Sequence, residues 1–369
     1  MTRGPVDETT AVGLLRGALE IPSPSYHEAE LAAYLVDVVR KLGMAAHIDR
    51  VGNLVASVEN GDGPTVMLIS HLDTVPGDLP VFSRDGRLYG RGAVDAKGSL
   101  AAMICAALGT SRFRGRIVVV GAVEEETPKS RGAMEIRATH ARPDAVIVGE
   151  PSGWSSVVLG YKGKLDLSYR VTCPPTHPSN PVEKASESAV AAWTALLDEL
   201  GPDAGHGAFD RPGATLCSIT GDTTVAEAEF SIRTPVGFST DAFLARLGDR
   251  VTKGELAVVN AVAACRSGRS DPVVRALTAA IRAQDGEPTM KVKTATSDMN
   301  TLAEVWDVPM AAYGPGDSTL DHADDEHIVI AEYLHGIAVL SAALEDIATA
   351  WRPSRPARHI RVLPMKELT

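Results

Sequence analysis

The chain has 369 residues, more than one ordinary hydrophobic core accommodates, so we expect two domains. Hydrophobic residues make up 44% and charged residues 22% of the chain, proportions that are normal for a soluble globular protein. The net charge of -11 argues against a nucleic-acid partner, because binding phosphate groups requires a basic surface.

Membrane insertion and secretion are not expected either. No apolar run approaches the roughly 18 to 20 residues that span a bilayer. Residues 1–10 are polar and lack the charged-then-apolar order of a signal peptide. The four cysteines stand far apart with no paired spacing, which predicts reduced thiols in a cytoplasmic protein.

In chain order, amphipathic helices are expected near residues 11–19 and 28–42, followed by a buried strand over residues 65–69. His71 and Asp73 come directly after that strand. On an extended chain their side chains point to the same face, so the Asp73 carboxylate can hydrogen-bond the imidazole and support it as a metal ligand. This pair alone is weak evidence for a metal site, because most His-x-Asp sequences lie in ordinary loops.

Further acidic residues and a histidine occupy similar positions elsewhere in the sequence. Asp95 opens a predicted helix that runs through Leu108. Taken singly, these residues fit an acidic turn, a carboxylate at a helix N-terminus and a loop histidine. Their coincidence at strand ends predicts a metal site, since ligands of open α/β sheets bind there. The residues that follow predicted strands are Glu124, Glu125 and Glu126 after 117–123, Glu150 after 144–148, and His322 after 308–313.

The pattern changes after Gly160. Residues 164–172 alternate between apolar and polar side chains, which is typical of a strand with one solvated face. The order strand, helix, strand, strand, helix, strand predicts a small ferredoxin-like layer. Its expected elements are a strand at 164–172, a helix at 183–200, strands at 214–219 and 225–234, a helix at 240–251 and a strand at 255–262.

The predicted fold class is therefore α/β, with one domain inserted in another. Residues 1–161 and 271–352 are expected to form a mostly parallel-sheet catalytic domain, which closes with a helix over 328–347. Residues 162–270 are expected to form the inserted α+β lid or dimerisation domain. Residues 353–369 carry four basic side chains beside three prolines, which predicts a loosely held basic tail.

The order His-x-Asp, Asp, Glu-Glu, Glu-Pro and a late His resembles the M20 metallopeptidase and aminoacylase family over nearly the whole chain. The resemblance implies two zinc ions, with cobalt or manganese as possible substitutes, and a water between them that attacks an amide. It implies Glu125 as the general base, Glu124 as a flanking acid and Asp73 as the support of His71. The implied ligands are His71 and Glu150 for one ion, Glu126 and His322 for the other, and Asp95 as the bridge.

Two residues of the inserted block also match family positions. His177 resembles a histidine that reaches across a homodimer to stabilise the oxyanion, although Thr176 and Pro178 depart from the family's Gly-His-Ser pattern. It is otherwise a solvated hairpin residue. Arg233 resembles an arginine that grips the substrate α-carboxylate, and it is otherwise a surface residue at a strand end. Asp222 stands near Gly221, where many relatives carry an asparagine.

Residues 160–163, 296–300 and 314–318 are similar to the branch that releases lysine or ornithine from an amino-group carrier protein, in lysine or arginine synthesis. The resemblance implies an acidic carrier as partner and cleavage at its glutamate side chain. Ser297 and Asp298 are expected either near the cargo pocket, where an acid pairs with a distal ammonium, or as a helix N-cap. A basic rim for the carrier is hypothesised from Lys129, Arg131, Arg137, Lys162 and Lys164.

Two alternatives remain at this point. The first is a deacetylase of free N-acetyl-ornithine or N-acetyl-lysine, or a dipeptidase, with the same metal centre. The second, from another class, is a non-catalytic binding protein that retains the metals. A complete ligand set together with Glu125 and His177 argues against the second alternative, because binding alone needs no general base.

Overall fold

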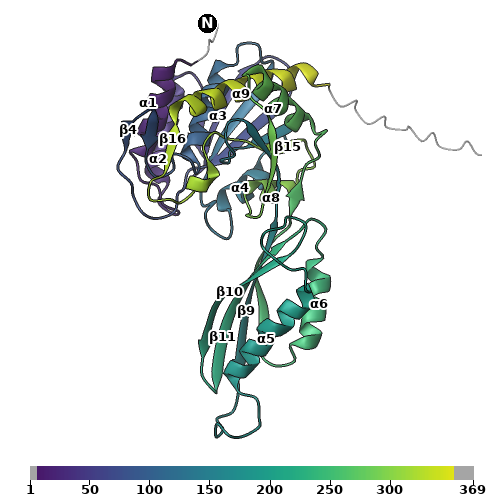
Figure 1. The fold of residues 1–369 in the computed structure, drawn as a ribbon. Helices are drawn as coiled ribbons and strands as arrows, with labels where there is room; N and C mark the ends of the chain where they lie inside the picture. The colour runs from purple at the N-terminus through teal and green to yellow at the C-terminus, as the bar shows by residue number, and fades with distance from the viewer. Residues whose placement is uncertain (1–5, 353–369) are drawn as a thin grey trace, which may run out of the picture.

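The structure, a computed structural model, describes residues 6–352 of the chain (Figure 1). The predicted tail, residues 353–369, lies outside the described residues. A mixed sheet of nine strands organises the larger part of the molecule. In spatial order its strands are β1 (Ala45–Ile48), β2 (Leu54–Asn60), β6 (Gly115–Ala122), β3 (Thr65–His71), β7 (Ala145–Val148), β15 (Met310–Ala312), β8 (Ser156–Tyr161) and β13 (Cys265–Arg266), with β14 (Thr289–Lys293) paired to β8.

The four central strands β6, β3, β7 and β15 run parallel, which confirms the predicted α/β fold class. They are fully apolar over most of their length, since both faces of the sheet are covered by helices. One face packs against α1 (Glu8–Leu19), α2 (Ala29–Lys41), α3 (Lys97–Gly109), α7 (Pro272–Ala283) and α9 (Ile330–Ala350). The other face packs against α4 (Arg131–Thr139) and α8 (Asp298–Ala303).

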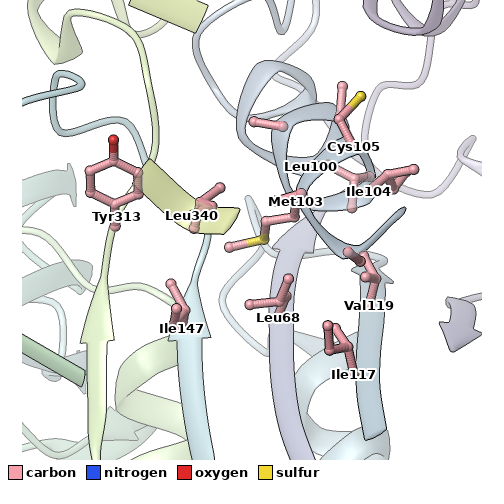
Figure 2. Packing of buried hydrophobic residues seen from close by; sticks show 14 of the residues in the cluster. Leu68, Leu100, Met103, Ile104, Cys105, Ile117, Val119, Ile147, Tyr313 and Leu340 are labelled. Carbon is pink, nitrogen blue, oxygen red and sulfur yellow. The ribbon is translucent and has the colours of Figure 1, made fainter. Parts of the chain in front are cut away.

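The alternation of a strand divides its side chains between these two cores. Leu68 and Ile147 lie on the face that α3 and α9 cover, with Met103 next to Leu68 and Leu340 next to Ile147 (Figure 2). Ile69, the residue after Leu68 in β3, points to the other face and belongs to the core on the α4 and α8 side. The central sheet is therefore held on both sides, and its carboxyl edge is fixed in position.

Residues inserted between β8 and β13 form a second layer, which extends from one end of the large part in Figure 1. Its antiparallel sheet has the order β10 (Gly213–Gly221), β11 (Val225–Thr234), β9 (Gly163–Thr172) and β12 (Glu255–Val262). Helices α5 (Ala185–Leu200) and α6 (Thr240–Arg250) cover one face and share a separate apolar core with it. This element and strand order is the predicted ferredoxin-like arrangement.

The remaining elements are short. A three-stranded sheet contains β16 (His327–Val329), β5 (Arg87–Tyr89) and β4 (Phe82–Arg84), and one turn of 3-10 helix covers Ser318–Leu320. Within residues 6–352, no helix combines the length and the apolar character that crossing a bilayer requires.

Candidate metal centre

Five side chains converge at the carboxyl edge of the parallel strands. His71 is the last residue of β3, and Glu126 lies in the turn that follows β6. Glu150 follows β7 by two residues, and His322 lies in the loop after β15. Asp95 precedes α3 by two residues. Neighbouring parallel strands end at one edge, so residues from distant parts of the sequence meet there.

Asp95 lies between the two histidines. Its Oδ1 is 3.2 Å from Nε2 of His71, and its Oδ2 is 3.2 Å from Nε2 of His322. The same His322 nitrogen is 2.9 Å from Oε1 of Glu126. The side chains form two possible ligand groups that share Asp95, namely His71, Asp95 and Glu150, and Asp95, Glu126 and His322, with donor atoms within 4.8 Å of one another in each group.

The unusual ionisation of these side chains reflects their crowding. Burial and the charge of Asp95 raise the pKa of Glu150 to about 8. A hydrogen bond with Asp95 raises the pKa of His322 to about 9. Burial lowers the pKa of His71, but the neighbouring carboxylates of Asp73 and Asp95 outweigh burial and raise it well above its usual value. Such mutual perturbation is expected of carboxylates and imidazoles crowded together at a site that binds cations, because bound cations relieve the repulsion between carboxylates.

Asp73 supports the site in a different way from the one that the sequence suggests. Nδ1 of His71 donates to the main-chain carbonyl of Asp73 at 2.8 Å, whereas the carboxylate is 3.6 Å away. The carboxylate instead accepts the amide N–H groups of Glu125 and Glu126, both at 3.0 Å, and the Ser25 hydroxyl at 2.8 Å. Asp73 therefore orients both the His71 ring and the glutamate turn, so that Nε2 of His71 faces Asp95 and is the ring nitrogen available to a metal.

Each of the three consecutive glutamates faces a different neighbour. Glu124 is paired with Arg131, and Glu126 faces His322. Glu125 is half-buried and lines a cavity of about 320 Å³ beside the ligands. Burial and the charge of Glu150 raise the pKa of Glu125 well above its usual value.

The cavity extends from the ligands to the inserted part. Arg233 of β11 and Lys164 of β9 line it from that side, and the Arg233 Nη1 donates to Oγ1 of Thr296 at 3.2 Å. Ser297 also lines the cavity, and it caps α8 by accepting the amide of Met299 at 3.2 Å. The predicted N-cap is thus present at a residue that also faces the cavity.

Asp298 and His177 do not line this cavity. Asp298 is 1% exposed and is not among the residues that line the cavity, and burial raises the pKa of its carboxyl to about 7. Its oxygens have no hydrogen-bond partner within the described residues. His177 is exposed between β9 and α5 and pairs with Ser179 at 2.7 Å. The segment between β9 and α5 lies at the end of the inserted part far from the large sheet (Figure 1).

Sequence reasoning missed Glu326, which is 1% exposed and hydrogen-bonded to the loop that carries Asp95. Its only sequence signal is its place four residues after His322, in a run with Asp324 and Asp325 that resembles any acidic turn.

Comparison with known proteins identifies relatives over most of the chain. The family model described as peptidase family M20/M25/M40 matches residues 67–346. A LysW-lysine hydrolase of Deinococcus radiodurans is 41% identical, covering 92% of this chain and 97% of that protein. A LysW-lysine/LysW-ornithine hydrolase of Saccharolobus islandicus is 29% identical, covering 92% and 96%.

Solved structures agree in fold. Aminopeptidase PepT of Bacillus cereus superimposes with a TM-score of 0.78 at 17% identity, covering 94% of this chain and 100% of that one. An M20 family metallo-carboxypeptidase of Sulfolobus solfataricus gives 0.75 at 19% identity, covering 93% and 100%. The family match and the 41% identical relative show that this chain is an amidohydrolase that belongs to peptidase family M20/M25/M40.

Proposed function

We propose that this protein hydrolyses the amide that joins lysine or ornithine to the glutamate side chain of an acidic amino-group carrier protein of the LysW kind. The names and the length coverage of the relatives from Deinococcus and Saccharolobus support the substrate. The chemistry is supported above all by Asp95, whose two carboxylate oxygens face histidines of different ligand groups.

The donor atoms fit two divalent cations. Imidazole and carboxylate ligands together suit zinc, with cobalt or manganese as substitutes. We assign His71 and Glu150 to one ion, Glu126 and His322 to the other, and Asp95 to both. Two ions held there would supply Lewis-acid activation of water and of the substrate carbonyl.

Glu125 is assigned as the general base. It lies in the cavity next to the ligand groups, and no hydrogen bond within the described residues occupies its carboxylate. A carboxylate with a raised pKa accepts a proton from the attacking water and then delivers it to the leaving amine. The two Asp73 hydrogen bonds hold the turn, so that Glu125 and Glu126 keep separate tasks.

Substrate binding is assigned to the wall of the cavity that the inserted part supplies. The Arg233 guanidinium can form a bidentate pair with the α-carboxylate of the released amino acid. Ser297 lines the same cavity and offers a hydroxyl. Asp298 is buried and does not line the cavity, but its charge acts on Glu125 and Glu150, so we assign it an electrostatic influence on a distal ammonium.

The basic rim proposed for the carrier is smaller than the sequence suggests. Arg131 is paired with Glu124, Arg137 with Glu304 and Lys164 with Asp166. Lys162 is buried and donates to the carbonyl of Arg211. Lys129 is exposed and has no ion pair within residues 6–352, so it is the rim residue best placed to meet an acidic carrier.

His177 has no contact with the metal ligands of its own chain within the described residues. We therefore propose that it acts, if it stabilises the oxyanion, on the active site of a second subunit in a homodimer. A dimer in which the inserted parts meet would also cover the apolar residues Val258 and Val259, which are exposed on the edge strand β12.

The competing activity is hydrolysis of free N-acetyl-ornithine, N-acetyl-lysine or a dipeptide. The metal groups and Glu125 serve this reaction equally well. The two activities differ in the surface that binds the substrate. Only a carrier protein is large enough to contact residues outside the cavity, so only its hydrolysis depends on them.

The test compares the zinc-loaded protein on carrier-linked lysine, carrier-linked ornithine and the matching N-acetyl amino acids. We expect a kcat/KM at least ~100-fold higher for a carrier-linked substrate, since the carrier adds binding surface. Lys129→Glu is expected to reduce kcat/KM for the carrier substrate and to leave the acetyl substrate unchanged. Lys41→Glu, an exposed lysine at the end of α2, is the control. Preference for an acetyl substrate would contradict the carrier proposal.

A further inference from the structure

The carboxylate of Glu326 accepts four hydrogen bonds from a single loop. Its Oε2 accepts from Nη1 of Arg91 at 2.9 Å and from the amide of Gly92 at 3.0 Å. Its Oε1 accepts from the amides of Val94 at 2.9 Å and Asp95 at 3.1 Å. The side chain is 1% exposed, so these donors, rather than water, satisfy its charge.

The same contacts connect the two loops that hold the second ligand group. Glu326 lies four residues after His322, and its carbonyl accepts the amide of Gly90 at 3.2 Å. Arg91 also donates to the carbonyl of Ala323 at 3.0 Å. Immediately afterwards β16 pairs with β5, which leads into the Asp95 loop. Glu326 therefore lies where the His322 segment is joined to the segment of the bridging carboxylate.

We infer that Glu326 is a positioning residue that fixes the main chain of Asp95 relative to His322. The inference rests on the proposed metal centre. Because Asp95 is the ligand common to both groups, a small rotation of its peptide changes both sites together. The His322 side chain is 49% exposed, so its position depends on the segment that carries it, and the Glu326 contacts join this segment to the Asp95 loop.

Glu326→Gln distinguishes a positioning role from simple packing. Glutamine keeps the size and shape of glutamate but replaces one of its two acceptor oxygens by an NH2 group. Its amide nitrogen is a donor, and it would face two of the four N–H groups. Loss of such a supporting contact typically weakens metal binding by about 10- to 100-fold. The matched control is Glu135→Gln, because Glu135 is also buried and binds Arg50 through both oxygens, away from the ligands.

The experiment titrates the metal-free full-length protein with Co²⁺ and follows the visible absorption of the bound ion. Wild type and Glu135→Gln are expected to bind two equivalents with the same spectrum. Glu326→Gln is expected to bind both equivalents more weakly, by about 10- to 100-fold, with an altered spectrum. With saturating metal, its kcat should fall while KM for substrate changes little, because the Arg233 wall is untouched.

The outcomes are distinguishable. Titration curves and spectra of Glu326→Gln that match wild type would overturn the inference, while failure of wild type itself to bind two ions would overturn the proposed metal centre. If Glu326→Gln does not fold, Arg91→Lys tests the inference instead. This substitution replaces the one side-chain donor to Glu326 by a shorter one and keeps the three hydrogen bonds from main-chain amides. It is expected to weaken Co²⁺ binding in the same direction by a smaller factor, and unchanged affinity would contradict the inference.

Discussion

At the scale of single residues, the glutamate turn after β6 shows how three identical side chains obtain different environments. Glu124 has a positive φ of 60° and pairs with Arg131, so it points away from the ligands. The next two amides donate to Asp73, which orients Glu125 into the cavity and Glu126 toward His322. The backbone, rather than the type of side chain, decides which carboxylate is available for proton transfer.

Glu125→Gln is expected to lower kcat by about 10²- to 10⁴-fold, because glutamine cannot accept the proton of the attacking water. Metal content should stay at two equivalents, since none of the assigned ligands changes. Kinetics with the preferred substrate and elemental analysis of the same sample provide the measurement. Glu124→Gln is the matched control and should retain most of kcat. An equal loss in both variants would contradict the assignment of Glu125.

Four of the five ligand candidates could be read from the sequence because each follows an apolar run that must be a buried strand, whereas Asp95 was read from its place before a predicted helix. The sequence predicted that Asp73 supports His71 but not which of its groups does so. Residue spacing does not distinguish the main-chain carbonyl of Asp73 from its carboxylate. Glu326 could not be found, because its four donors lie more than 230 residues away in the sequence. Only the folded chain brings such groups together.

At the scale of elements, segments with a strong apolar or alternating pattern were predictable, and the short strands without such a pattern were not. β3, β6 and β7 are continuous apolar runs, and β9 alternates along its length, so pattern alone identifies them. β13 has two residues and β4 has three, which is too few for any periodicity. These strands form because neighbouring strands offer free hydrogen-bonding groups, and that information is not local.

Helix α7 offers a test at this scale. Oδ1 of Asp271 accepts the amides of Val273 and Val274 at 2.8 and 3.4 Å, and its Oδ2 accepts the amide of Met310 at 3.3 Å. Asp271→Ala removes both the helix N-cap and the contact with β15. We expect it to lower the free energy of unfolding by about 1–2 kcal/mol, as measured by urea denaturation.

The control for Asp271→Ala is Glu287→Ala, an exposed carboxylate beyond the other end of α7 with no hydrogen bond or ion pair in the described part of the chain. It should unfold at the same urea concentration as wild type. Equal destabilisation by the two substitutions would show that the cap contributes nothing specific.

At the scale of the whole molecule, metal removal is expected to couple stability to pH. In the metal-free protein the pKa of Glu150 is about 8 and that of His322 about 9, both above their usual values. A raised pKa stabilises the folded state at low pH, and this stabilisation is lost as pH rises through 8 to 9. Entering ions must displace the same protons, so the affinity for zinc rises over that interval.

We therefore expect zinc to raise the thermal midpoint of chelator-treated protein more at pH 8.5 than at pH 6.5. The measurement is a thermal melt with and without excess zinc at both pH values. Magnesium, which prefers oxygen ligands in octahedral geometry, is the control and should have little effect. A zinc effect that is larger at pH 6.5 would contradict the assigned ligands.

The place where the inserted part joins the large part has a consequence for how this chain can vary over evolutionary time. Tyr161 and Cys265 are register partners in neighbouring antiparallel strands, so the chain departs and returns at adjacent points, about 5 Å apart in such ladders. The hundred-odd residues between them therefore connect two adjacent strands of the sheet, as a hairpin turn does. The entropy of closing a connection grows only slowly with its length. Substitutions, insertions or deletions in that connection can therefore change which substrates reach the candidate metal centre. The scaffold that holds the candidate ligands remains under separate selection.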